Sequence, residues 1–259
     1  MSQPQRPIRA ICFDLDDTLC AYWDASKKGL HRAFEICGPP DHTPEEMIGH
    51  WAEAFRKFYK DFKSGEWYQK YLEKGGVTRN YQMWLALQEV GIDDQVLAEC
   101  LGDTYHKERQ AALELFPEAE PILAILAQKY PLGLITNGPA DVQRDEINVL
   151  EIGKYFDLIL IEGEQKIGKP HEEVFRRAEE HFKCDPSELL FVGNSYGHDI
   201  RPALDRGWQA IWIRRSSDVP PSSQGVNSKP EEKPEGAPEP TMTISSLNQV
   251  IDFLLAPRS

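Results

Sequence analysis

Three aspartates follow a short apolar run near the N-terminus, and this combination places the strongest constraint on the fold of the chain. Residues 11–13 end an apolar run that is typical of a buried strand, and Asp14, Asp16 and Asp17 come directly after it. Because successive side chains of a strand point to opposite faces, Asp14 and Asp16 are expected on the same side. Two neighbouring carboxylates repel each other and lose hydration on burial. A hard cation, or a phosphate group that is attacked, would compensate for both effects.

A simpler interpretation of the same residues is a strand followed by an acidic turn, in which Asp17 and Thr18 cap the next helix. Aspartate is common in turns for local hydrogen-bonding reasons, so this segment alone leaves both interpretations open. The residues that follow the later strands have to decide between them.

Residues 21–115 show a helical pattern and no convincing strand. Thr43 and Glu46 mark a helix start in capping-box register, with Thr at the N-cap and Glu at N3. Thr78 is expected to cap a further helix, which ends at Gly91. This block therefore predicts a small all-helical domain.

From residue 116 onward short apolar runs alternate with helical segments, and the run at 11–13 belongs with them. Such alternation is typical of a parallel sheet that is covered by helices on both faces. The further predicted strands are 132–136, 158–161, 189–192 and 210–213. The sequence thus predicts an α/β fold with a Rossmann-like parallel sheet. Its core would comprise 1–20 and 116–259, and the all-helical domain at 21–115 would be an insertion.

Residues 216–240 are rich in Pro, Ser, Glu and Lys and nearly free of apolar side chains. Such a composition buries too little surface to offset the entropy that the chain loses on folding. A mobile surface loop is therefore expected here, followed by a closing helix at 247–255.

The carboxyl ends of the predicted strands carry polar residues that suit phosphoryl transfer. Ligands of open parallel sheets bind at these ends, where residues that follow different strands meet. The set combines carboxylates, hydroxyls, amides and an ammonium, from Asp14, Asp16, Thr18, Thr136, Asn137, Lys169, Asn194 and Asp199. Phosphoryl transfer depends mainly on positioning and on charge neutralisation, which such groups supply.

The same residues resemble the motifs of a known family, the haloacid dehalogenase-like (HAD) hydrolases. Asp14-Leu-Asp16-Asp-Thr18 fits the first family motif, Asp-x-Asp-x-Thr. Thr136, Lys169 and residues 193–199 fit the second, third and fourth motifs in order. The resemblance covers about residues 8–212, and the inserted helical block resembles the C1 cap of the family.

The resemblance implies a role for each of these residues. Asp14 would attack phosphorus and form an aspartyl-phosphate, and Asp16 would protonate the leaving group and then activate water. Phosphate binding would fall to Thr136, Asn137 and Lys169. The expected cofactor is Mg²⁺, which prefers hard oxygen ligands, here from Asp14, Asp16, Asn194 and Asp199.

An aspartate at position 16 favours phosphate chemistry, because the dehalogenases of the family need neither an acid there nor a metal. The resemblance therefore implies a Mg²⁺-dependent phosphatase that hydrolyses a small phosphomonoester of the nucleotide or phosphosugar type. Two alternatives stay open: a phosphomutase or phosphotransferase acting on a phosphosugar, and a non-catalytic phosphate-binding regulator. The second rests on Asn194, which stands where the fourth motif usually has aspartate. We expect Asn194→Asp to tighten Mg²⁺ binding.

Charge and composition limit the partners. A formal net charge of −13 argues against a nucleic-acid partner. No apolar segment is long enough to span a bilayer, and the N-terminus lacks the apolar run of a signal peptide. The five cysteines are scattered and odd in number, which fits a reducing, cytoplasmic setting. The sequence leaves the oligomeric state open.

Overall fold

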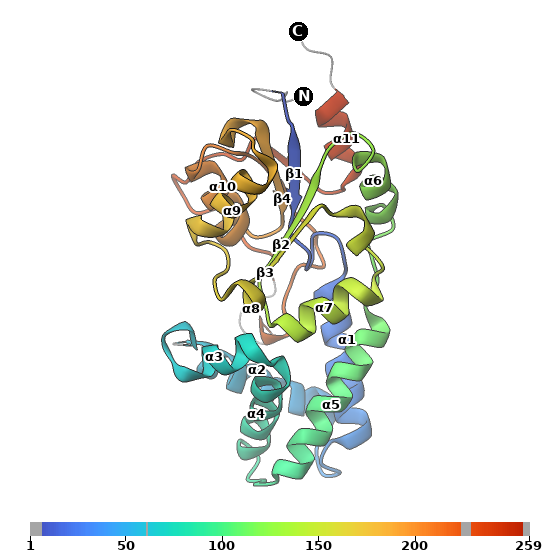
Figure 1. The fold of residues 1–259 in the computed structure, drawn as a ribbon. Coiled ribbons are helices and arrows are strands. Elements are labelled where there is room, and N and C mark those ends of the chain that lie inside the picture. The colour runs from blue at the N-terminus through green and yellow to red at the C-terminus, as the bar shows by residue number, and fades with distance from the viewer. Residues whose placement is uncertain (1–6, 61, 224–228, 256–259) are drawn as a thin grey trace.

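A sheet of six parallel strands forms the centre of the described part of the chain (Figure 1). The structure is a computed structural model that describes residues 7–60, 62–223 and 229–255. The strands are Ala10–Phe13 (β1), Leu132–Thr136 (β2), Leu158–Ile161 (β3), Leu189–Gly193 (β4), Gln209–Ile213 (β5) and Met242–Ile244 (β6). Their order in the sheet is β3-β2-β1-β4-β5-β6. The predicted α/β fold with a Rossmann-like parallel sheet is confirmed.

Helices cover both faces of the sheet. Side chains of β1 alternate between two apolar cores, with Ile11 and Phe13 in one and Ala10 and Cys12 in the other. The first core includes α6 (Ala119–Leu126), α7 (Ala140–Val149) and α11 (Asn248–Leu255), and the second includes α9 (Glu172–Phe182) and α10 (Arg201–Asp205). Because both faces are buried, the strands read as continuous apolar runs in the sequence.

Strand β1 lies where the order of the sheet reverses. It pairs with β2 on one side and with β4 on the other, and the chain extends the sheet outward in both directions from there. A crevice at the carboxyl ends of the strands is expected at such a point. The residues that follow β1, β2 and β4 therefore meet in one place.

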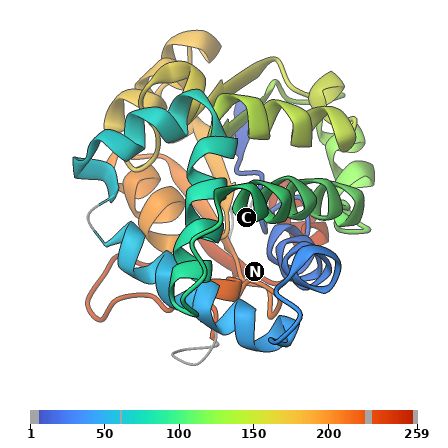
Figure 2. The same cartoon turned by 90° about the horizontal axis from the view of Figure 1, so that it is seen from below.

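The helical block between β1 and β2 forms a separate layer over the carboxyl ends of the strands (Figures 1 and 2). It comprises α1 (Tyr22–Cys37), α2 (Pro44–Tyr59), α3 (Glu66–Glu73), α4 (Gly75–Gln88) and α5 (Gln95–Ala112), and it is called the cap below. Four of these helices, α1, α2, α4 and α5, share an apolar core of their own. Cys20 and Leu115 form an isolated bridge where the chain enters and leaves the cap. The division into 1–20, 21–115 and 116–259 stays a proposal.

The two cap helix starts that the sequence suggested have different outcomes. The capping box is confirmed, because Thr43 accepts a hydrogen bond from the Glu46 amide and the Glu46 carboxylate accepts one from the Thr43 amide. The expected cap at Thr78 is wrong, since α4 begins at Gly75 and Thr78 Oγ1 donates to the Gly75 carbonyl at 3.1 Å. The Asp141 carboxylate of the core accepts the Gly75 amide at 3.1 Å. A tertiary contact therefore starts this helix earlier than its own sequence suggests.

Strand β6 was not predicted. Its three residues are too few to show a period, and they follow a polar segment. Its register is set by β5, where Ile211 pairs with Met242 and Ile213 pairs with Ile244. A short edge strand of this kind is fixed by its neighbour and not by its own propensity.

Gly29 allows α1 and α5 to approach closely, and this contact generates a test. A Cβ atom at position 29 would lie 2.9 Å from both Cβ and the backbone nitrogen of Arg109. We expect Gly29→Ala to lower the free energy of unfolding by about 1–3 kcal/mol, because the two helices must separate. Urea unfolding followed by circular dichroism measures this.

Gly49 of α2 provides the matched control. A Cβ there meets nothing within 4 Å. Gly49→Ala should therefore raise the free energy of unfolding by up to about 1 kcal/mol through helix propensity. Equal effects of the two substitutions would show that the α1–α5 contact is not tight.

Candidate active site

Asp14 lies at the end of β1, between two hydrogen-bond donors. Lys169 Nζ donates to its Oδ1 at 2.6 Å, and Thr18 Oγ1 donates to its Oδ2 at 2.9 Å. Only 7% of the Asp14 surface is exposed. The chain turns sharply after it through Asp17, whose backbone is left-handed (φ 57°) and whose carboxylate accepts the Trp23 amide at 3.2 Å. The turn brings Thr18 back to the carboxylate that precedes it.

Lys169 is a buried cation between two carboxylates. Its Nζ lies 2.6 Å from Asp14 Oδ1 and 2.7 Å from Asp199 Oδ1, and 2% of the residue is exposed. Burial alone would lower the pKa of Lys169, but the charges of Asp14 and Asp199 outweigh this and raise it. The side chain therefore remains an ammonium at the centre of the site.

Asn137 holds the backbone of Lys169 in place. Its Oδ1 accepts the Lys169 amide at 2.8 Å, and its Nδ2 donates to the Lys169 carbonyl at 2.7 Å. Both polar ends of the amide side chain are thus engaged with the residue that carries the central charge. The predicted contact of Asn137 with phosphate stays a proposal, and its observed contacts position Lys169.

Asp199 closes the site from the segment after β4. Its Oδ2 accepts the Ser195 amide at 2.9 Å, while its Oδ1 faces Lys169. Burial raises the pKa of Asp199 to about 7, and Lys169 opposes the rise. A Cβ at position 193 would lie 2.4 Å from Asp199 Oδ2, so only glycine fits before this turn.

The side-chain amide of Asn194 is held by one hydrogen-bond acceptor and one hydrogen-bond donor. Its Nδ2 donates to Asp218 Oδ2 at 3.0 Å, and its Oδ1 accepts from Thr18 Oγ1 at 3.4 Å. These contacts orient the amide oxygen toward the Asp14 side of the site. Asp218 lies in the segment 216–240, for which the sequence predicts only a mobile loop. Mobility stays a prediction, and residues 224–228 lie outside the described residues.

Glu231, in the same segment, also contacts the turn after β4. Its carboxylate accepts the amides of Tyr196 at 2.9 Å and of Gly197 at 3.1 Å. Neither Asp218 nor Glu231 belongs to a recognisable sequence motif. Nothing short of the tertiary structure could have assigned them to the site.

Asp16 lies half-buried beside Asp14 and belongs to a hydrogen-bonded chain that reaches the cap. Gln143 Nε2 donates to Asp16 Oδ2 at 3.2 Å and to Glu146 Oε2 at 2.8 Å. Glu146 in turn accepts from Arg109 Nη2 at 2.9 Å. Thr136 Oγ1 donates to Gln143 Oε1 at 2.5 Å.

This environment sets the protonation of Asp16. Burial raises the pKa of Asp16 well above its usual value, and the charges of Glu146, Asp14 and Asp17 add to the rise. The Gln143 hydrogen bond opposes it. The raised pKa favours the protonated form of Asp16. Sequence reasoning missed Gln143 and Glu146, which lie one helical turn apart on α7 and belong to no motif.

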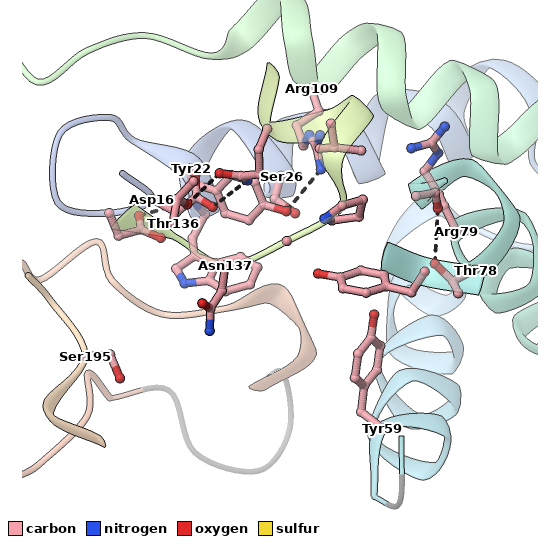
Figure 3. A pocket seen from close by; sticks show the side chains of 18 of the residues that line it. Asp16, Tyr22, Ser26, Tyr59, Thr78, Arg79, Arg109, Thr136, Asn137 and Ser195 are labelled. Carbon is pink, nitrogen blue, oxygen red and sulfur yellow. Dashed lines mark hydrogen bonds between the residues drawn. The ribbon is translucent and has the colours of Figure 1, made fainter. Parts of the chain in front are cut away.

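One cavity of about 370 Å³ collects these residues (Figure 3). Its core side is lined by every predicted site residue: Asp14, Asp16, Thr136, Asn137, Lys169, Asn194 and Asp199. Its cap side is lined by residues of α1, α2, α4 and α5, including Tyr22, Trp51, Tyr59, Arg79, Gln82 and Arg109. The structure thus brings the predicted residues together, while their roles remain to be proposed.

The donor set fits a magnesium ion. Asp14 Oδ2 and Asn194 Oδ1 both approach Thr18 Oγ1, at 2.9 and 3.4 Å, so two hard oxygens share one corner of the site. Magnesium takes one or two carboxylates and completes its shell with water and substrate oxygens. Within the described ranges no group of three or more His, Cys, Asp or Glu side chains is arranged for a metal.

Comparison with known proteins identifies the family. The sequence model of the haloacid dehalogenase-like hydrolases matches residues 11–213. The chain belongs to this family. It is 30% identical over 219 residues to N-acylneuraminate-9-phosphatase of Rattus norvegicus, with 83% of this chain and 86% of the relative covered. It is 33% identical over 210 residues to glyceraldehyde 3-phosphate phosphatase of Methanothermobacter thermautotrophicus, with 80% and 85% covered.

A solved structure shares the HAD fold of the chain. The magnesium-bound HAD hydrolase YfnB of Bacillus subtilis superposes with a TM-score of 0.71 at 19% identity, over 96% of this chain and 100% of that one. The resemblance to HAD hydrolases is thus confirmed, and the phosphatase relatives make the chain an HAD phosphoric monoester hydrolase. Across the described helices, none combines the length and apolar character needed to cross a membrane.

Proposed function

We propose that this HAD phosphatase is Mg²⁺-dependent and hydrolyses a small phosphomonoester through an aspartyl-phosphate on Asp14. The observation that carries the proposal is the position of Asp14, which lies in a cavity beside the Lys169 ammonium and next to an Asp16 of raised pKa. The named activities of the relatives concern a phosphorylated sugar acid and a triose phosphate, which supports a phosphosugar type of substrate. We also propose a reducing, cytoplasmic setting, because the five cysteines are scattered along the chain and odd in number.

In the first half-reaction an Asp14 oxygen forms a bond to phosphorus while the bond from phosphorus to the leaving oxygen breaks. The Asp16 proton passes to that leaving oxygen, which departs as an alcohol. Lys169 and Thr18 stay close to the Asp14 carboxylate, so they hold the nucleophile in position. Thr136 and Asn137 line the same cavity and are proposed to contact the phosphoryl oxygens.

In the second half-reaction the ionised Asp16 takes a proton from a water molecule. The water oxygen attacks phosphorus, the bond to Asp14 breaks, and inorganic phosphate leaves with both carboxyl groups restored. The cap covers the cavity and limits the entry of other water during these steps. One bound Mg²⁺ would supply charge neutralisation at the phosphoryl group. The residues proposed to hold it are Asp14, Asp16 through its backbone carbonyl, Asn194 and Asp199.

Phosphate release from a panel of phosphosugars and nucleotides, with Mg²⁺ and with EDTA, tests the function. We expect release that needs the metal and that Asp14→Asn reduces by about 10³-fold or more, because the nucleophile is lost. Residual activity near that of the wild type would contradict a covalent role for Asp14. Transfer to a second sugar in place of release would favour the phosphomutase alternative, and binding without turnover would favour the regulator.

Leaving-group chemistry tests the role of Asp16. Asp16→Asn should lower kcat for alkyl phosphates by about 10²–10⁴-fold, because their alkoxides need a proton. The loss for p-nitrophenyl phosphate should be smaller, since p-nitrophenolate leaves without one. Burst kinetics separate the first half-reaction from the second, in which Asp16 also acts. Equal losses in the burst phase for both substrates would rule out proton donation by Asp16.

The Asn194–Asp218 contact modifies what is expected of Asn194→Asp. A carboxylate at position 194 would face Asp218, now 3.0 Å from the amide nitrogen, so repulsion opposes the gain in metal affinity. The double variant N194D/D218N exchanges the two groups and keeps a hydrogen bond between them. We expect it to bind Mg²⁺ about tenfold more tightly than N194D alone. Calorimetric titration of the protein with Mg²⁺ measures this, and equal affinities would show that Asp218 does not act on position 194.

A further inference from the structure

Two arginines line the cap side of the cavity, and they differ in their partners (Figure 3). Arg109 of α5 donates to Glu146 at 2.9 Å and to the Tyr22 hydroxyl at 3.0 Å. Arg79 of α4 makes no hydrogen bond or ion pair with any residue in the described ranges, and its Nε is shielded from solvent. Among the described residues that line this cavity, Arg79 is therefore a cation without an ion-pair partner.

The position of Arg79 is unfavourable in the absence of a ligand. Burial lowers the pKa of Arg79, and the nearby charge of Arg109 lowers it further. The charges of Asp103 and Asp141 oppose this lowering of the pKa, but neither carboxylate makes an ion pair with Arg79. Asp141 Oδ1 instead accepts the amides of Gly75 and Val142, at 3.1 and 2.9 Å. Guanidinium nevertheless keeps its proton in proteins, and the buried Nε–H of Arg79 has no hydrogen-bond partner among the described residues.

The charges of the cavity are separated along its depth. Every carboxylate that lines it lies at the core end, on Asp14, Asp16, Asp17 and Asp199. Described residues of the cap contribute aromatic rings, hydroxyls, an amide and the two guanidinium groups to the lining, but no carboxylate. Because Arg109 is paired with Glu146, a ligand that places its phosphate beside Lys169 would turn its other end toward the unpaired charge of Arg79.

We propose that Arg79 binds a second anionic group of the substrate, so that the preferred phosphomonoesters carry a carboxylate or a second phosphate at the end remote from the reacting one. This inference rests on the proposed function and names its substrate class. The planar fork of arginine matches both kinds of anion with two parallel hydrogen bonds. A cavity of about 370 Å³ holds a compact molecule of this kind.

Matched substrate pairs test the proposal on the unaltered protein. Glycerol 3-phosphate and 3-phosphoglycerate differ in one group, a hydroxymethyl against a carboxylate, and fructose 6-phosphate and fructose 1,6-bisphosphate differ by one phosphate. We expect kcat/KM to be about 10- to 100-fold higher for the anionic member of one pair, as for a charge-assisted contact. The pair that shows the preference tells whether the anion is a carboxylate or a phosphate. No preference in either pair would overturn the proposal.

Substitution of Arg79 tests whether this residue causes the preference for the anionic substrate. Arg79→Met should reduce the ratio of kcat/KM within the preferred pair by about 10- to 100-fold. Arg79→Lys should restore part of the ratio, because it returns the charge without the fork. Arg32→Met is the control, since Arg32 lies on the cap surface with 49% of its side chain exposed and pairs with Glu35. A ratio that survives in Arg79→Met would overturn the proposal.

Two further measurements separate the outcomes. Hydrolysis of p-nitrophenyl phosphate by the wild type reports the proposed function without a second anion, so its absence refutes that function and not the anion site. Calorimetric binding of the two members of each pair to the Asp14→Asn protein tests the anion site without turnover. Tighter binding of the anionic member supports it, and equal binding overturns it. If Arg79→Met fails to fold, the substrate pairs measured on the wild type and on Arg79→Lys still test the proposed anion site.

Discussion

The buried ammonium of Lys169 is the interaction on which the site depends. Asp14 and Asp199 both contact it, at 2.6 and 2.7 Å, and its positive charge offsets the repulsion between these two carboxylates. The position of the ammonium is in turn fixed by Asn137, which holds the Lys169 backbone from both sides. Lys169 and Asn137 thus connect the residues at the carboxyl ends of β1, β2 and β4.

A second set of contacts connects Asp16 to the cap. Asp16, Gln143, Glu146 and Arg109 form a continuous chain of hydrogen bonds from the carboxyl end of β1 to α5. The charge of Glu146 raises the pKa of Asp16, and Arg109 pairs with that charge. The protonation of Asp16 is therefore coupled to a residue of the cap. Any movement of α5 relative to α7 would change the electrostatic surroundings of Asp16.

The fold class, and the set of residues that line the core side of the cavity, could be predicted from the sequence. Continuous apolar runs specify strands that are buried on both faces, and polar residues at their ends meet because parallel strands present these ends at one edge. Asp14, Lys169 and Asp199 were predictable for that reason, since each follows a strand or lies in a recognisable motif. The Thr43 helix start was predictable as well, because its capping box is made within one turn of chain.

Several contacts of the cavity could not be predicted from the local sequence. Asp218 lies in a segment of low-complexity composition, yet it binds Asn194, and its place depends on the path of the chain beyond β5. Gln143 lies on an ordinary helix, and only the packing of α7 turns it toward Asp16. Arg79 looks like any surface arginine of a cap helix, and its isolation is visible only once the surrounding charges are placed. Contacts between segments that are distant in the chain leave no periodic pattern or fixed motif spacing in the sequence. They can therefore be found only in the folded structure.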